Sequence, residues 1–252
     1  MTAGVLLALA AALIVGLMLG GLGGGGSILA VPVLVYLAGI DPKPAIAMSL
    51  VVVGVTAAVA LIPHARAGRV HWRTGLLFGG FGMAGAYAGG RIAAYLPAAV
   101  LLAGLAVMML LTAVAMLRPS RTAPPTAAVR RRPLAKIAVE GTAVGLITGL
   151  VGAGGGFLVV PALVLLGGLS MPAAIGTSLL VISLKSGAAL AGYLHSVAID
   201  WPLTLSVTAL AVAGSLIGAR LAGRINPSAL RRGFGWFVIV MGLGVLTGQL
   251  LA

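Results

Sequence analysis

The chain has 252 residues, of which 61% are hydrophobic and only 8% are charged, whereas soluble domains carry about 25% charged residues. It contains no cysteine, which excludes disulfides, thiolate metal sites, iron–sulfur clusters and cysteine nucleophiles. A net charge of +13 would suit a nucleic-acid-binding protein, but in a membrane protein basic residues mainly mark the loops that stay in the cytoplasm. The composition therefore predicts an all-α, polytopic protein of the cytoplasmic membrane that binds no nucleic acid.

The first half of the chain, residues 1–117, consists of apolar segments separated by short polar breaks. Runs of about 20 apolar residues are long enough to cross the hydrocarbon core of a bilayer as helices. The segments expected here are 4–22, a short one at 28–39, and then 45–63, 74–94 and 98–117.

A basic linker, expected at 118–136, joins this half to a second one at 137–252. The linker includes RPSRTAPPTAAVRRRP, whose Pro, Thr and Arg residues predict a solvated loop. The second half repeats the pattern of the first, with segments expected at 137–152, a short 157–169, 173–194, 203–222 and 233–251.

The two halves are copies of one unit. A single shift along the chain, which carries Gly20 onto Gly149, places GGLGGGGSILAVPVLVYLAG on GLVGAGGGFLVVPALVLLGG without a gap. In this repeat alignment, matches of Gly, Ala, Leu and Val are inflated by the composition, but matched proline, tryptophan and arginine pairs are not. These pairs are Pro32 with Pro161, Trp72 with Trp201, and Arg91 with Arg220.

Basic residues predict that the two copies lie upside down relative to each other. The loop at 64–73 carries three arginines, while its counterpart at 193–202 carries no lysine or arginine. The next pair of loops has the opposite bias, because 91–97 carries one arginine and its counterpart at 220–232 carries four. With inverted copies, 13 of the 16 basic residues face the cytoplasm. Both termini are then expected outside and the linker inside.

The glycine block GGLGGGGSILAVP, residues 20–32, raises the question of a nucleotide site. Gly21, Gly23 and Gly26 fit the dinucleotide fingerprint G-x-G-x-x-G, but that motif needs a short strand before it. The residues that precede the block are apolar on every face and too many for a strand. The sequence therefore argues against a dinucleotide.

The short segments after each glycine block predict a different role. Each is too short to cross about 30 Å of hydrocarbon, and irregular backbone at that depth is tolerated only inside protein or along a cavity. We expect a discontinuous, glycine-broken helix hairpin in each copy, with Pro32 and Pro161 in the first turn of the short helix. Exposed N–H groups and the helix dipole would then favour an anion. The alternative is that the glycines only let helices approach closely, which suits Gly79, Gly82, Gly85, Gly89, Gly214 and Gly218.

Two stretches resemble the TauE/SafE family of sulfite and organosulfonate exporters. They are GLGGGGSILAVPVLVYL and GAGGGFLVVPALVLLGGLSMPAAIGTSLLVI, each followed by a loop with V-x-W or I-x-W, in RVHWR and AIDWP. The resemblance covers nearly the whole chain and implies export of small sulfur-containing anions such as sulfite or sulfoacetate. A carrier working by alternating access around a midplane site, and a channel with the same half-helices, both fit. No paired carboxylates, Ser–Lys pair or His cluster indicates an enzyme.

Lys185 is the strongest candidate for contact with an anion. It lies near the middle of the segment at 173–194, where an unpaired cation is costly, and its counterpart is Thr56. An anionic substrate would be a natural partner. The alternatives are a lysine bonded to helix-end carbonyls and a lysine that reaches an interface.

Hydroxyl and glycine residues complete the candidate site. Ser49 and Ser178, the latter beside Thr177, hold matching positions; their hydroxyls could bind an oxyanion or bond back to their own helix. In the glycine blocks a Cβ would obstruct the ligand and any φ above zero, but alanine should be mild at Gly24, Gly79 and Gly82, whose counterparts are not glycine. The candidate substrate-binding residues are Gly25, Gly26, Ser27, Ser49, Gly154, Gly155, Gly156, Thr177, Ser178 and Lys185, with no catalytic residue, cofactor or metal expected.

Overall fold

The computed structural model describes residues 3–117, 134–152, 156–166 and 168–221, together with residue 236 and some positions between 239 and 247. The regular structure within these ranges is helical. In chain order it consists of α1 (Ala3–Leu22), α2 (Ser27–Pro32), the π-helix η1 (Val33–Leu37), α3 (Pro42–Arg66), α4 (Trp72–Ala93), α5 (Ala98–Leu117), α6 (Leu134–Val151), α7 (Gly156–Pro161), the π-helix η2 (Ala162–Leu166), α8 (Met171–Tyr193) and α9 (Trp201–Leu221).

The expected apolar segments agree closely with these helices. Every segment up to residue 222 begins and ends within three residues of a helix, or of a short helix and the π-helix that continues it. The last expected segment, 233–251, lies largely outside the described residues. Helix α6 begins at Leu134, so residues 134–136 of the expected linker are helical.

Four of the described helices, α1, α3, α8 and α9, are long and apolar enough to cross a membrane. Their most apolar windows have mean hydropathies between 1.5 and 2.6. A multi-pass membrane protein has this architecture.

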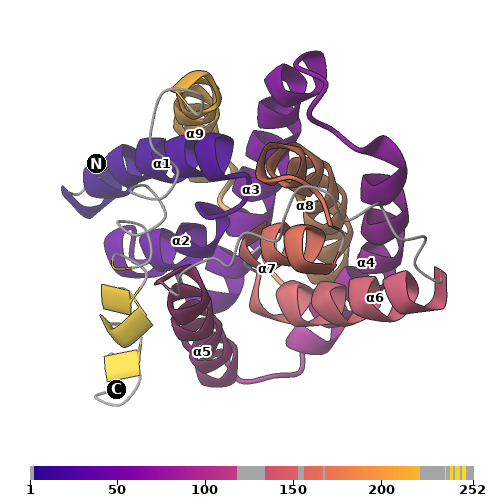
Figure 1. Cartoon of the computed structure of the whole chain (residues 1–252). Helices are drawn as coiled ribbons and strands as arrows, with labels where there is room; N and C mark the ends of the chain where they lie inside the picture. The colour runs from indigo at the N-terminus through magenta and orange to yellow at the C-terminus, as the bar shows by residue number, and fades with distance from the viewer. Residues whose placement is uncertain are drawn as a thin grey trace.

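The helices of the two halves are packed against each other rather than side by side as separate bundles. Helices α3 and α8 pack together at the centre, with α1 and α9 on one side and α4 and α6 on the other (Figure 1). The repeat alignment carries α1 onto α6 and α4 onto α9. Each of these contacts between the halves therefore recurs with the halves exchanged.

Glycines bring the flanking helices into backbone contact. A Cβ at Gly16 or Gly20 of α1 would overlap a carbonyl oxygen of α9, and one at Gly145 or Gly149 of α6 would overlap a carbonyl oxygen of α4. In return, a Cβ at Gly214 or Gly218 of α9 would overlap a carbonyl oxygen of α1, and one at Gly85 or Gly89 of α4 would overlap a carbonyl oxygen of α6. The packing role expected for these last four glycines fits this geometry, which is the small-residue contact typical of membrane helices.

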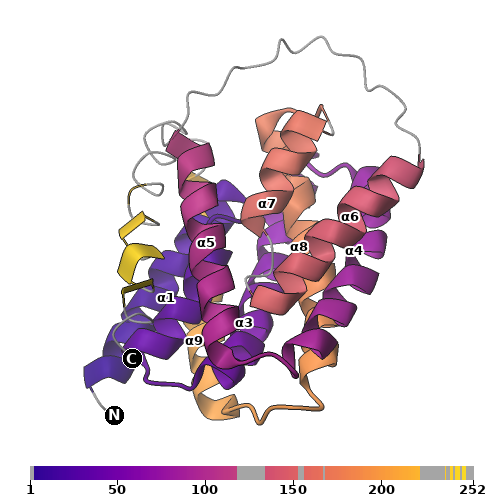
Figure 2. The same cartoon turned by 90° about the horizontal axis from the view of Figure 1, so that it is seen from below.

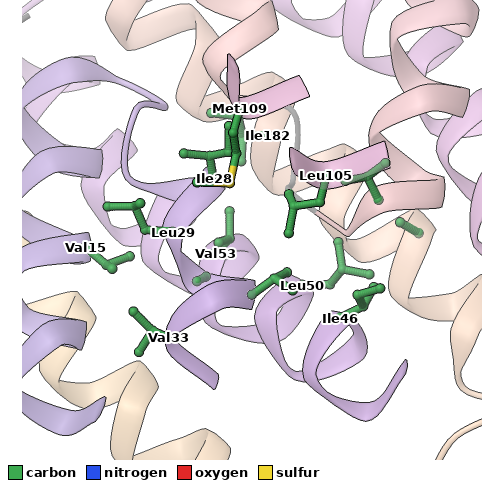
Figure 3. Close-up of a cluster of buried hydrophobic side chains, with 14 of the residues drawn as sticks. Val15, Ile28, Leu29, Val33, Ile46, Leu50, Val53, Leu105, Met109 and Ile182 are labelled. Atoms are coloured by element: carbon green, nitrogen blue, oxygen red, sulfur yellow. The ribbon is translucent and has the colours of Figure 1, made fainter. Parts of the chain in front are cut away.

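An apolar core joins the short helix α2 to the long helices around it (Figure 3). Ile28 of α2, Leu50 of α3, Leu105 of α5 and Ile182 of α8 are all fully buried in it. Because lipid is as apolar as these side chains, close packing rather than removal from water holds such a core together.

The expected position of the prolines is wrong. The short helices begin at Ser27 and Gly156, so that Pro32 and Pro161 are their last residues and not part of the first turn. A proline there lacks the N–H that would continue the α-helical bonding, and a π-helix follows directly in both halves.

Connections that correspond in sequence lie at opposite ends of the bundle. The connection between α3 and α4 lies at one end, and that between α8 and α9 lies at the other (Figure 2). The first of these carries Arg69, while the second, 194–200, contains no lysine or arginine.

Candidate functional site

In the first half, a turn of glycines separates the long helix α1 from the short helix α2; in the second half, Gly152 follows α6 and 153–155 lie outside the described residues. Gly23, directly after α1, has φ +71°, and Gly152, directly after α6, has the same value. Only glycine adopts this left-handed conformation readily. A Cβ at Gly23 would come within 2.7 Å of Cα of Ile175, and one at Gly152 within 3.0 Å of Cβ of Ile46. Gly23 and Gly152 thus share one backbone φ value and have equivalent neighbours, each taken from the other half.

Each turn is held by a serine of the opposite half. Ser49 Oγ lies 2.9 Å from the carbonyl oxygen of Gly152 and 2.7 Å from that of Ile46. Ser178 Oγ donates in the same way to the carbonyl oxygens of Gly23 and Ile175. Because a hydroxyl has one hydrogen, these carbonyls share it, and each serine bonds both to its own helix and to the opposite turn. Contact of the two hydroxyls with an oxyanion stays a prediction.

The first glycine turn also meets the start of α7. A Cβ on Gly156 would lie 2.5 Å from Cα of Gly24 and 2.6 Å from Cδ1 of Ile182. A Cβ on Gly24 would in turn overlap the carbonyl group of Gly156. The expectation that alanine is mild at Gly24 is therefore wrong: the alanine counterpart at 153 shows which residue that half carries, but not how close the opposite backbone comes.

Two of the other candidate glycines, Gly25 and Gly26, lie in the first glycine turn. Gly25 and Gly26 are buried, and a Cβ on Gly26 would come 2.8 Å from the backbone nitrogen of Leu19. Gly26 has φ −69°, so the left-handed position is Gly23 instead. Gly154 and Gly155 lie outside the described residues.

Ser27 and Thr177 make local bonds. Ser27 Oγ donates to the carbonyl oxygen of Gly24 at 2.7 Å and so closes the first glycine turn. Thr177 Oγ1 accepts the backbone N–H of His71 at 2.9 Å, which ties α8 to the residue before α4. Neither contact was evident from the sequence.

Lys185 is the charged side chain at the centre of the bundle. It lies on α8 with 1% of its surface exposed, and its Nζ has no hydrogen-bond partner among the residues that the structure describes. Its stem runs beside Gly82 of α4. Lys185 is seven residues from Ser178, which is about 10 Å along the helix. The serine–glycine contacts and the lysine are thus two neighbouring places on α8 and not one cluster.

Several polar groups were missed by sequence reasoning. The hydroxyls of Thr56 and Ser186 are buried and without a hydrogen-bond partner within the described ranges. His64 Nε2 lies 3.1 Å from the carbonyl oxygen of Gly20, while Tyr193, its counterpart, donates to that of Leu150 at 2.7 Å. The repeat alignment could have paired His64 with Tyr193, but no signal in the sequence marks Ser186.

Among the described residues, the arrangement offers the buried amine of Lys185 and a glycine turn that packs against the other half. A buried cation needs an opposite charge or several hydrogen bonds to offset the loss of hydration. In a helical bundle that spans the membrane, such a group marks the path of an ion or a substrate.

Comparison with known proteins agrees with this architecture. The family described as "Sulfite exporter TauE/SafE" matches residues 8–245. A "Probable membrane transporter protein" of Xylella fastidiosa is 35% identical over 240 residues, covering 92% of this chain and 91% of that protein. A "Probable membrane transporter protein" of Bacillus subtilis is 26% identical over 221 residues, covering 86% and 90%. No solved structure matches the chain. The chain belongs to the TauE/SafE sulfite exporter family and is a multi-pass membrane transporter.

Proposed function

We propose that the protein is a secondary transporter that exports small sulfur-containing anions, sulfite or organosulfonates such as sulfoacetate, across the cytoplasmic membrane. Transport would proceed by alternating access around an anion site near the midplane that includes Lys185. The observation that carries this proposal is the complete burial of Lys185 without a hydrogen-bond partner among the described residues.

Burial argues against the two structural roles of this lysine. A lysine that reaches toward an interface would expose its ammonium group, whereas Lys185 is 1% exposed. A lysine that caps a helix end would show carbonyl oxygens as partners, and the described residues provide none. A bound anion would offset the cost of the buried charge.

The glycine turns are proposed as the second part of the site. Backbone N–H groups of Gly25, Gly26 and Ser27, and of 154–156 in the other half, would donate to the anion when a turn opens. The reciprocal bonds of Ser49 and Ser178 would hold the turns closed in the arrangement described above.

We also propose that residues 1–117 and 137–252 are inverted repeats joined by a cytoplasmic linker. The opposite placement of the α3–α4 and α8–α9 connections supports this, because the first is basic and the second is not. Single cysteines at Thr122, Asp41 and Ser196 of this cysteine-free chain test it with an impermeant maleimide in intact cells. Labelling is expected at Asp41 and Ser196 alone, and labelling at Thr122 with protection of the other two would reverse the topology.

Export of an anion needs no coupling ion. With the cell interior negative, each negative charge leaves downhill by about 2.3 kcal/mol per 100 mV. A carrier of this kind is expected to work without a proton gradient.

The test is flux through the purified protein in liposomes, with sulfite, sulfate, sulfoacetate and taurine compared, each with and without a pH gradient. Sulfite or sulfoacetate should show saturable flux that Lys185→Ala abolishes and Lys185→Arg partly retains. Lys136→Ala is the matched control, because Lys136 is exposed. Normal flux in a folded Lys185→Ala variant would refute the site, and non-saturating flux would favour a channel.

A further inference from the structure

Two equivalent contacts between the halves differ in the sizes of their residues. In one, Lys185 of α8 in the second half lies beside Gly82 of α4 in the first half. The equivalent positions are Thr56 of α3 in the first half and Ala211 of α9 in the second, and these helices also pack together. The longer side chain therefore has the smaller residue on the opposite helix, and the shorter side chain has the larger one.

Gly82 leaves room for the lysine stem. A Cβ at Gly82 would lie 2.9 Å from Cδ and 3.2 Å from Cγ of Lys185, and 3.4 Å from the carbonyl oxygen of Gly141. The first distance is shorter than a carbon–carbon contact allows. Because the crowded atoms belong to a flexible side chain, alanine there would displace the lysine before it displaced a helix.

Other glycines on the same helix have different neighbours. A Cβ at Gly85 or Gly89 would overlap carbonyl oxygens of α6, so these glycines serve the contact between two helices. At Gly79, one turn before Gly82, the nearest atom is Cδ1 of Leu184 at 3.0 Å. Gly82 is thus distinguished from its neighbours by contact with the side chain of Lys185.

We propose that Gly82 is a positioning residue of the anion site: it forms the slot that holds the stem of Lys185 and fixes where its ammonium group lies. This inference rests on the proposed function of Lys185. It also replaces the expectation that Gly82 is a neutral packing position. The unequal pairs assign the anion-binding charge to Lys185 of the second half, because the glycine that faces it on the first half leaves the slot for a long side chain, whereas Ala211 stands at the equivalent position.

The test compares Gly82→Ala with Gly79→Ala in purified protein. Each variant is measured by sulfite affinity and by melting temperature with and without sulfite, since a ligand stabilises the state to which it binds. Gly82→Ala should weaken sulfite binding about tenfold or more, as expected when a binding group is displaced by a fraction of its length. Gly79→Ala should bind as wild type.

A double variant separates positioning from general packing. Gly82→Ala combined with Lys185→Thr makes this pair the same as its repeat equivalent, Thr56 with Ala211. Without sulfite, Gly82→Ala should lower the melting temperature when residue 185 is lysine and leave it unchanged when residue 185 is threonine. An equal loss in both backgrounds would mean that Gly82 only packs helices, and would overturn the inference.

The outcomes also distinguish this inference from the proposed function. If Lys185→Thr alone binds sulfite as wild type does, the proposed site is wrong. If Lys185→Thr loses binding but Gly82→Ala keeps it, the site stands and the positioning role of Gly82 is refuted. If Gly82→Ala does not fold, recovery of folding in the double variant supports the slot, and failure to recover overturns it.

Discussion

Helices α3 and α8, which are equivalent in the two halves, make the same contacts at one position and differ at another. At the glycine turns the contacts occur twice, since Ser49 bonds to Gly152 as Ser178 bonds to Gly23. Two helical turns farther along α8 the equivalence ends, because Lys185 occupies the position that Thr56 holds in the first half. The comparison teaches that the two halves share the contacts of Ser49 with Gly152 and of Ser178 with Gly23, while a buried lysine in one half stands where the other half has a threonine.

The largest expected effect comes from Gly23 and Gly152, two equivalent glycines that have positive φ values. Gly23→Ala and Gly152→Ala should each destabilise the protein by about 3 kcal/mol or more, because a left-handed residue costs about 1–2 kcal/mol and overpacking adds about 1–3 kcal/mol. Melting of the purified variants in detergent measures this.

Two other glycines provide a matched control for the turns. Gly39 and Gly168 have φ values of +69° and +66°, with nothing within 4 Å of a Cβ. Alanine there should cost only the conformational part. If Gly23→Ala is no worse than Gly39→Ala, the turns are not closely packed against the opposite half.

A smaller and again symmetric effect is expected from the serines. Ser49→Ala and Ser178→Ala each leave a buried glycine carbonyl with fewer donors, and should cost about 1–3 kcal/mol of stability. Ser206, which is exposed and bonds to its own helix, is the control and should change stability by at most about 0.5 kcal/mol. Loss of sulfite binding without loss of stability would instead make the two hydroxyls ligands of the anion.

The smallest effect is expected from the two unpaired hydroxyls. Thr56→Val and Ser186→Ala remove buried hydroxyls that have no partner in the described part of the chain, and should raise stability by up to about 1 kcal/mol. Thr208→Val is the control, because Thr208 Oγ1 donates to the carbonyl oxygen of Thr204 at 2.7 Å, and it should be neutral or destabilising. A clear loss of stability in Ser186→Ala would show that its hydroxyl has a partner.

The helices could be predicted from the sequence because each depends on a local property. A run of apolar residues ended by polar or glycine-rich breaks locates a membrane helix, and the repeat alignment supplies the same evidence a second time. The burial of Lys185 could also be predicted, since a lysine in the middle of an apolar run faces the interior of the bundle or a water-filled cavity.

The contacts of the site depend on which helices meet, and this information is not local. Nothing in the sequence shows that Ser178 lies beside Gly23 of the other half, or that Gly82 faces Lys185. The repeat alignment predicted wrongly that alanine would be mild at Gly24. The alanine at the equivalent position shows the size of that residue, but not that the backbone of Gly156 lies close to Gly24. Pro32 was misplaced although the start of the helix was predicted to within one residue, because Pro32 is the sixth residue from Ser27 and so lies beyond the first turn.

The most direct test of the central claim is the sulfite affinity of Lys185→Thr, measured by titration calorimetry on purified protein. This substitution makes the two halves alike at the one position that introduces a buried charge. The account predicts a folded protein with a melting temperature near or above that of wild type, because a buried amine that has no hydrogen-bond partner among the described residues is removed, and with no measurable sulfite binding. Sulfite binding at wild-type affinity in this variant would contradict the account.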